Sequence, residues 1–238
     1  MGVIRIVGAC LLIALPCSTS HSQSYDVVGI ERLPEVSLDA RQIKIHSQGL
    51  YVSDSEYIVT GRVDTPPRRP VVIRFPRTDL SGYEVFDLGL IDTTNVGLNH
   101  PGGFDRDQQD VFWIPVSTSH RRGPTIIVGL KLVGGRLPAD VSKIYRSFEF
   151  PDHIGAVACL DNGRLLAANW DTKKVYLIDS ETGKLIDDFP NEQIFGGEGI
   201  QLAVQDWKYD RAEKHVVAGG IDKSRGRKPA QSVATVAW

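Results

Sequence analysis

Three histidines recur at nearly constant spacing in this 238-residue chain, and they are the residues best placed to do chemistry. His100 follows His46 by 54 residues, and His153 follows His100 by 53. Twelve positions after each histidine stands an apolar pair: Ile58-Val59, Phe112-Trp113 and Leu165-Leu166. A fixed period with a fixed internal offset indicates consecutive copies of one structural unit, so the three imidazoles should occupy equivalent positions.

Converging imidazoles can bind a divalent metal ion. The fourth unit lacks the histidine, but Gln205 or Asp206 would supply an oxygen ligand near its expected position. One metal ion held by His46, His100 and His153 would polarise an oxyanion or activate water, as a hydrolase or lyase requires. Two alternatives stay open, because each histidine could instead fix its loop or contact a ligand directly. The sequence therefore leaves open whether the protein is an enzyme.

Each histidine begins a unit of four predicted strands separated by polar turns. The apolar pair marks the second strand, and an alternating or apolar run marks the third and the fourth. Third strands are predicted at residues 71–75, 125–128 and 175–178, and fourth strands at 83–86, 144–148 and 184–186. No convincing helix longer than a turn or two interrupts this pattern.

A fourth unit begins near Val204 and is partly preserved. Its apolar pair is Val216-Val217, its third strand is predicted at residues 232–238, and the chain stops before a fourth strand. Four-stranded units of about 50 residues are typical of a β-propeller, whereas an open β-sandwich would not explain the histidine period. The sequence predicts an all-β propeller with about four blades visible, the last closed by the N-terminal strand at 25–33 or truncated.

Residues 1–22 have the pattern of a secretory signal peptide. Arg5 supplies the positive charge, and the apolar run that follows it is too short to cross a membrane, so no transmembrane segment is expected. Pro16 directly before Cys17 fits a lipid-attachment motif poorly, which favours soluble export over a lipid anchor. We therefore expect a secreted or periplasmic protein.

After removal of this segment, residues 23–238 are expected to form a single propeller domain. Cys159 would be the one cysteine left, so no internal disulfide could form. Its apolar neighbours indicate a small buried side chain and no catalytic role.

Charge is nearly balanced over the whole chain, with 27 basic and 29 acidic residues, so composition gives no reason to expect a nucleic-acid partner. Its distribution is uneven, because every unit has basic residues in the loop between its second and third strands. These are Arg68 and Arg69, Arg121 and Arg122, Lys173 and Lys174, and Arg225 and Arg227.

In a propeller, these loops share one face with the histidine segments, and we call it the histidine-bearing face. Trp170 could add an aromatic platform there, while the turns of the opposite face are rich in Asp and Glu. A basic face attracts anions. The alternative is that these basic residues are only solvated surface residues at the rim and bind no ligand.

Two motifs carry a family resemblance. His100-Pro101-Gly102-Gly103 and Asp152-His153-Ile154-Gly155 resemble repeats of an uncharacterised family of exported bacterial β-propeller-like proteins, a domain of unknown function. The resemblance extends over roughly residues 40–220 and implies a propeller and export, but no reaction. Lactonase-type propellers are similar more distantly, at the level of fold alone, since histidines stand where acidic metal ligands are expected.

The function expected from these observations is binding of an anionic small molecule or polymer on the histidine-bearing face. A metal-dependent, lactonase-like hydrolase or lyase with a His-lined channel is the first alternative. A scaffold whose rim binds a protein partner is the second. The identity of the ligand and the oligomeric state stay open.

Overall fold

The computed structural model describes residues 32–93, 95–190, 202–222 and 230–237. The predicted signal peptide at 1–22 lies outside the described residues, as do Arg225 and Arg227. Within them the fold is all-β, without an α-helix, and the main sheets are antiparallel. No helix in these ranges is long and apolar enough to cross a membrane.

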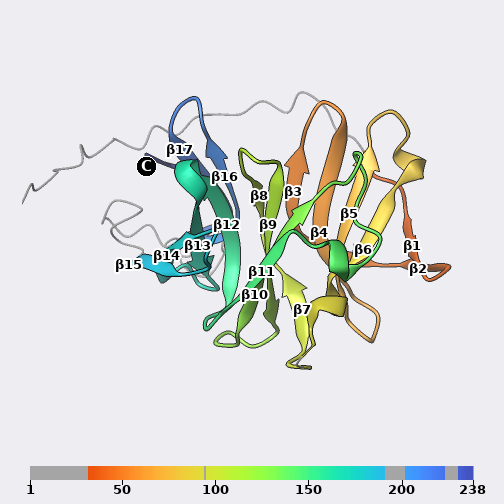
Figure 1. The fold of residues 1–238 in the computed structure, drawn as a ribbon, viewed down its shortest axis with the longest axis horizontal. Coiled ribbons are helices and arrows are strands. Elements are labelled where there is room, and N and C mark those ends of the chain that lie inside the picture. The colour runs from red at the N-terminus through yellow and green to blue at the C-terminus, as the bar shows by residue number, and fades with distance from the viewer. Residues whose placement is uncertain (1–31, 94, 191–201, 223–229, 238) are drawn as a thin grey trace, which may run out of the picture.

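Four sheets follow a short N-terminal hairpin in chain order. In Figure 1 the first lies on the right, the second in the centre, and the third and fourth together on the left. The hairpin is β1 (Val36–Leu38) and β2 (Arg41–Ile43). The first sheet contains β3 (Ile45–Val52), β4 (Glu56–Val63), β5 (Pro70–Pro76) and β6 (Glu84–Asp87). The second contains β7 (Leu98–Pro101), β8 (Asp105–Arg106), β9 (Val111–Thr118), β10 (Thr125–Lys131) and β11 (Arg146–Phe150).

The third sheet contains β12 (Ile154–Leu160), β13 (Arg164–Asn169), β14 (Lys174–Asp179) and β15 (Leu185–Pro190). The fourth has three described strands, β16 (Leu202–Asp210), β17 (His215–Asp222) and β18 (Ala230–Ala237). Short 3-10 turns lie at Leu80–Gly82, Leu88–Ile91, Val141–Lys143 and Asp161–Gly163.

Strand β9 shows why the sheets stack face to face. Every residue of this strand is buried, because both faces of its sheet are covered. Phe112 and Ile114 point into a cluster shared with the first sheet, whereas Val111 and Trp113 point into one shared with the third. Burial of each large side chain contributes about 1.5–3 kcal/mol. Because alternate side chains of β9 enter the two clusters, this one strand packs the second sheet against both the first and the third.

The first strand of each sheet is its inner strand, and the inner strands meet one another. Strand β12 contacts β8 and β16, and β16 contacts β3. Gly103 pairs with Ala156 of β12 in a parallel bridge, which fixes a common direction for these two segments. The histidines therefore lie where the inner strands begin, and the acidic turns follow where they end.

Most predicted strands are present, with one break. The second inner strand is divided into β7 and β8 because the chain between them leaves its own sheet to bond β12. The Gly103 N–H donates to the Gly155 carbonyl at 2.9 Å, and the Val157 N–H donates to the Gly103 carbonyl at 3.0 Å.

The structure tests only the end of the predicted N-terminal strand. The predicted strand at 25–33 lies mostly outside the described residues, and its described end, Arg32 and Leu33, is not in a strand. The hairpin β1–β2 was not expected. Its turn residues Asp39 and Ala40 adopt positive φ angles of 53° and 59° without the glycine that usually signals such a turn.

A register shift recurs in every inner strand. It lies between Ser47 and Gly49, between Ile154 and Ala156, and between Val204 and Asp206, whereas in the second sheet it lies earlier in the unit, between Leu98 and His100. The residues inside the shifts are Gln48, Asn99, Gly155 and Gln205. Such β-bulges re-aim neighbouring side chains and are common beside functional sites. The fourth unit, which lacks the histidine, shares this feature.

Candidate ligand site at the histidine-bearing face

Two of the recurring histidines come together around an indole. The rings of His100 and His153 have centroids 5.4 Å apart, and Trp170 contacts both, at 5.0 Å and 4.4 Å. The Arg121 guanidinium lies 6.0 Å from the centre of the Trp170 ring. We call these four residues the His–Trp–Arg cluster. It unites two of the predicted metal ligands with two of the predicted ligand-binding residues.

His153 is fully buried, and only one of its ring nitrogens is satisfied. Nδ1 donates to the carbonyl oxygen of His120 at 2.9 Å, so Nδ1 carries the proton of the neutral ring. Nε2 then presents a lone pair that has no hydrogen-bond partner among the described residues. A buried polar atom without a partner is uncommon in native proteins and points to a missing donor or ion.

Asp152 positions this histidine together with the loop that carries Trp170. One carboxylate oxygen accepts from the His153 N–H at 2.8 Å. The other accepts from Asn169 Nδ2 at 3.0 Å and from the Tyr176 hydroxyl at 2.7 Å. Burial, and then this bond to Asp152, raise the pKa of the Tyr176 hydroxyl, so it stays a donor. The backbone N–H of Trp170 also donates to the backbone carbonyl of His153 at 2.9 Å.

His100 is held in its neutral form. Burial is the main cause that lowers its pKa to about 4, and repulsion from His153, Arg62 and His46 lowers it further. Burial also lowers the pKa of His153. The neighbourhood therefore disfavours a positive charge on either ring.

Arg62 is a site residue that the sequence did not suggest. It lies on β4 opposite His46, its side chain is only 17% exposed, and its Nε has no hydrogen-bond partner in the described part of the chain. An Asp64 oxygen lies 3.5 Å from its guanidinium. No basic residue occupies the same place in the other units, so the repeat pattern gave no signal for it.

The bulge residues add amide groups to the histidine-bearing face. Gln48 donates from its side-chain nitrogen to His46 Nδ1 at 3.0 Å. Asn99 lines a cavity of about 390 Å³ together with Arg68 and Leu90, and its Oδ1 is buried without a partner among the described residues. Gln205 is exposed. The cavity thus combines a cation, a free acceptor and an apolar wall.

The predicted basic residues fall into two groups. Arg69 bonds Asp39 and Asp87 at 2.9 Å and 3.0 Å, and Lys174 bonds Asp188 at 3.1 Å, so both are engaged in ion pairs. Arg121 lies 3.5 Å from Asp171 and is 70% exposed. The exposed side chains of Arg68, Arg122 and Lys173 form no ion pair within the described ranges.

The five predicted metal ligands are not gathered at one point. Asp206 accepts hydrogen bonds from the Leu50 and Phe104 N–H groups, both at 3.2 Å, and pairs with Lys208 Nζ at 2.6 Å. These bonds tie the fourth sheet to the first two. Across the described residues, no group of three or more His, Cys, Asp or Glu side chains is placed to hold a metal ion. Cys159 is buried and free, as expected.

The acidic turns of the opposite face carry more basic partners than the sequence suggested. Asp161 pairs with Lys214 and lies 4.0 Å from Arg211, and Asp110 bonds Arg106 at 2.6 Å. The opposite face therefore has local ion pairs, which weakens the expected contrast in charge between the two faces.

Comparison with known proteins assigns no family. No family model and no curated protein matches the chain. It is similar to a protein of unknown function from Bacteroides caccae, at 13% identity and a TM-score of 0.47 over 83% of this chain and 69% of that one. It is also similar to Kluyveromyces lactis Hsv2, at 12% identity and a TM-score of 0.40 over 76% of this chain and 48% of that one, or about half of Hsv2.

Another similar structure is Myxococcus xanthus glutaminyl cyclase, at 11% identity and a TM-score of 0.36 over 81% of this chain and 92% of that one. At these scores and identities, the likenesses transfer no activity to this chain.

The low pKa of His100 predicts that the stability of the fold depends on pH. Because the pKa of His100 is about 4 in the folded protein and 6.5 for an unperturbed histidine, the unfolded chain binds more protons between these values. Stability should therefore fall as pH drops from 7 to 5, by about 1–2 kcal/mol after allowance for partial exposure. Urea unfolding at both pH values measures this loss. His100→Gln should reduce the slope, and an unchanged slope would show that His100 titrates normally.

Proposed function

We propose that the four sheets are blades of a β-propeller and that its histidine-bearing face binds an anionic ligand. The observation that carries the proposal is the His–Trp–Arg cluster, in which the Nε2 of the buried His153 lies beside Trp170 with no partner in the described part of the chain. The sequential stacking of the sheets and the contacts between inner strands support the propeller. The pattern of residues 1–22 supports export.

The charges near this cluster favour an anion over a neutral or cationic ligand. Arg62 is close enough to lower the pKa of His100, and Arg121 lies over Trp170. Arg68, Arg122 and Lys173 add exposed positive charge at the same face. An anion bound in such a partly desolvated place gains charge-assisted hydrogen bonds, which are about twice as strong as neutral ones.

The neutral imidazoles define a second requirement. The unprotonated Nε2 of His153 can accept a hydrogen bond but cannot donate one. Because His153 is fully buried, a ligand donor reaches this atom only when a neighbouring ring of the cluster shifts. The proposed ligand therefore carries a hydroxyl or N–H donor as well as its anionic group. The Trp170 ring provides a flat surface for the remaining part of the ligand, whether a small molecule or one residue of a polymer.

Binding is better supported than metal-dependent hydrolysis or a purely structural scaffold. Hydrolysis on the predicted plan needs His46, His100, His153 and either Gln205 or Asp206 to converge. Asp206 is engaged with Lys208 and two backbone N–H groups, and in the described ranges no three His, Cys, Asp or Glu side chains are placed to hold a metal ion. A scaffold role would leave unexplained the buried polar atoms of His153 and Asn99 that find no partner within the described ranges.

Isothermal titration of the protein with citrate, a hydroxylated anion, tests the proposal. Citrate should bind, and affinity should fall as salt rises from about 20 to about 200 mM, because the contact is partly electrostatic. Trp170→Ala should weaken binding about tenfold or more, and Arg62→Gln should do the same. Tricarballylate, which lacks the hydroxyl, should bind more weakly than citrate.

Lys174→Gln is the matched control. Lys174 is the first residue of β14, directly after the basic loop of the same face, but it is paired with Asp188, so its replacement should change citrate affinity by less than about threefold. If Lys174→Gln and Arg62→Gln lost the same citrate affinity, binding would depend only on the net charge of the protein. That result would contradict a defined site.

A further inference from the structure

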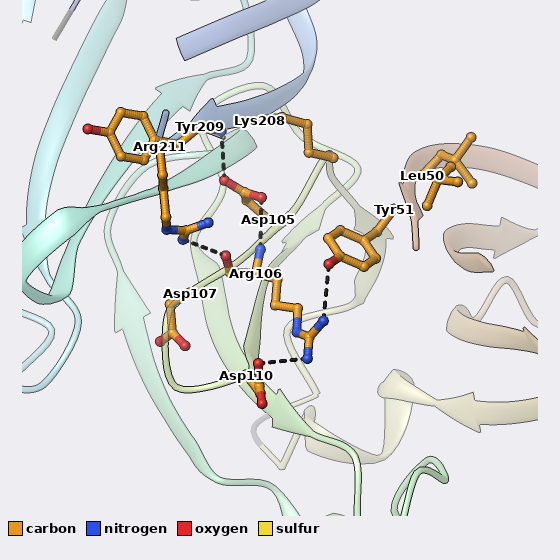
Figure 2. Close-up of a pocket in the computed structure, with 10 residues that line it drawn as sticks. Leu50, Tyr51, Asp105, Arg106, Asp107, Asp110, Lys208, Tyr209 and Arg211 are labelled. Carbon is orange, nitrogen blue, oxygen red and sulfur yellow. Dashed lines mark hydrogen bonds and ion pairs between the residues drawn. The ribbon is translucent and has the colours of Figure 1, made fainter. Parts of the chain in front are cut away.

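A second cavity lies at the other end of the inner strands, away from the three recurring histidines. Its volume is about 530 Å³, within the usual range for small-molecule sites. Residues at the ends of β3, β8 and β16 line it, including Leu50, Tyr51, Arg106 and Arg211 (Figure 2). This cavity is independent of the site proposed above.

One wall of the cavity is apolar and poorly covered. Leu50 and Val52 at the end of β3 are 45% and 53% exposed, although both are large aliphatic residues. Tyr51 lies between them in sequence, and its hydroxyl accepts from Arg106 at 3.1 Å. Exposed apolar side chains that line a concave surface favour the apolar part of a ligand.

Two of the three cations that line the cavity are already neutralised. Lys208 Nζ donates to Asp206 and to the carbonyl oxygens of Phe104 and Trp207. Arg106 pairs with Asp110 at 2.6 Å. Figure 2 shows the Arg106 guanidinium directed toward Tyr51 and Asp110. Neither side chain has a full positive charge to offer to a ligand.

Arg211 is the cation with charge to spare. Its Nη2 donates to the carbonyl oxygens of Arg106 and Cys159, at 2.8 Å and 3.3 Å, and these carry no formal charge. Its Nε is buried without a hydrogen-bond partner among the described residues. The nearest carboxylate, Asp161, is 4.0 Å away and is itself paired with Lys214.

We infer that this cavity binds an amphiphilic monocarboxylate, with its carboxylate at Arg211 and its apolar chain against Leu50 and Val52. Arg211 Nη2 is taken by two carbonyl oxygens, but Nη1 forms no hydrogen bond within the described residues, so a carboxylate would be held by Nη1 and by the charge of the guanidinium. The carboxylates of Asp105, Asp107 and Asp110 line the same cavity, so a doubly charged phosphate would meet more repulsion than a single carboxylate. The ligand class therefore follows from three features: the cation of Arg211 favours an anion, the apolar wall favours a chain, and the three carboxylates limit the anion to a single charge.

Titration calorimetry with octanoate tests this inference, with acetate, octanol and octyl phosphate as matched probes. Octanoate should bind at least tenfold more tightly than each of the others, since it alone combines one negative charge with a chain. Arg211→Gln should remove this preference over octanol. Equal affinities for octanoate and octanol would overturn the inference.

Val52→Asp provides an independent variant, because Arg211 also bonds two backbone carbonyls and its loss could disturb folding. The exposed position of Val52 should tolerate the change, and octanoate affinity should fall at least tenfold. Trp170→Ala, at the other face, should leave octanoate binding unchanged. If Val52→Asp binds octanoate as well as the unmodified protein does, the assigned wall is wrong.

Discussion

Substitution of alanine for Gly103 is expected to lower the free energy of unfolding by about 4 kcal/mol or more, the largest effect foreseen here. A Cβ atom at this position would lie 2.6 Å from the Asp206 Cα atom and closer still to the Gln205 carbonyl oxygen. Both obstacles are backbone, so neither can rotate away. Relief requires the segment between β7 and β8 to move away from β16, and such a movement strains the Gly103 bonds to Gly155 and Val157 as well. Urea unfolding followed by tryptophan fluorescence measures the change.

Gly155→Ala is the matched control for this substitution. It lies in the neighbouring inner strand, but the nearest atom to its added Cβ would be 3.8 Å away, an ordinary contact. Its free energy of unfolding should change by less than about 1 kcal/mol. If Gly103→Ala were as stable as Gly155→Ala, the close approach of the second and fourth sheets would be wrong.

Replacement of Asp105 by alanine is expected to cost about 3 kcal/mol of stability. The Asp105 carboxylate accepts from the Cys159 N–H at 3.0 Å and from the N–H groups of Tyr209 and Arg106, both at 2.9 Å. It therefore joins the second, third and fourth sheets, and Figure 2 shows it between Tyr209 and Arg106. Alanine would leave these donors without their acceptor.

Asp105→Asn separates the hydrogen bonds from the charge. Burial raises the pKa of Asp105, which means that its charged form is costly there. Asparagine avoids this cost and keeps one acceptor oxygen, so Asp105→Asn should lower the free energy of unfolding by only about 1 kcal/mol. Thermal melts of both variants, compared at one pH, provide the measurement. Equal losses for alanine and asparagine would contradict the bridging role.

The strand order within each unit could be predicted because it depends on local patterns in the sequence. Alternation and polar turns placed the third strand of the first unit at residues 71–75, and the structure has it at Pro70–Pro76. The break between β7 and β8 could not be predicted, because it depends on a contact of Gly103 with a different sheet. The predicted closure of the last sheet by residues 25–33 lies mostly outside the described residues.

The candidate site was partly predictable for a similar reason. The histidine period brought His100 and His153 to equivalent positions, and the structure places their rings 5.4 Å apart. Arg62 escaped prediction because it appears in one unit alone. Asp206 was expected near the channel, but its bonds to Leu50 and Phe104 come from segments far away in sequence. Such contacts follow from the packing of sheets and leave no local signal.

Long-range ¹H–¹⁵N spectroscopy of the histidine side chains, with and without citrate, tests the central claim most directly. Without ligand, His153 should show the tautomer protonated at Nδ1 that its bond to His120 requires, and His100 should stay neutral at pH 6. On addition of citrate, the ring signals of His100 and His153 should shift with the indole signal of Trp170, while His215 stays unchanged. Binding of citrate with no shift at His100 or His153 would contradict the account, because the anion would then bind elsewhere.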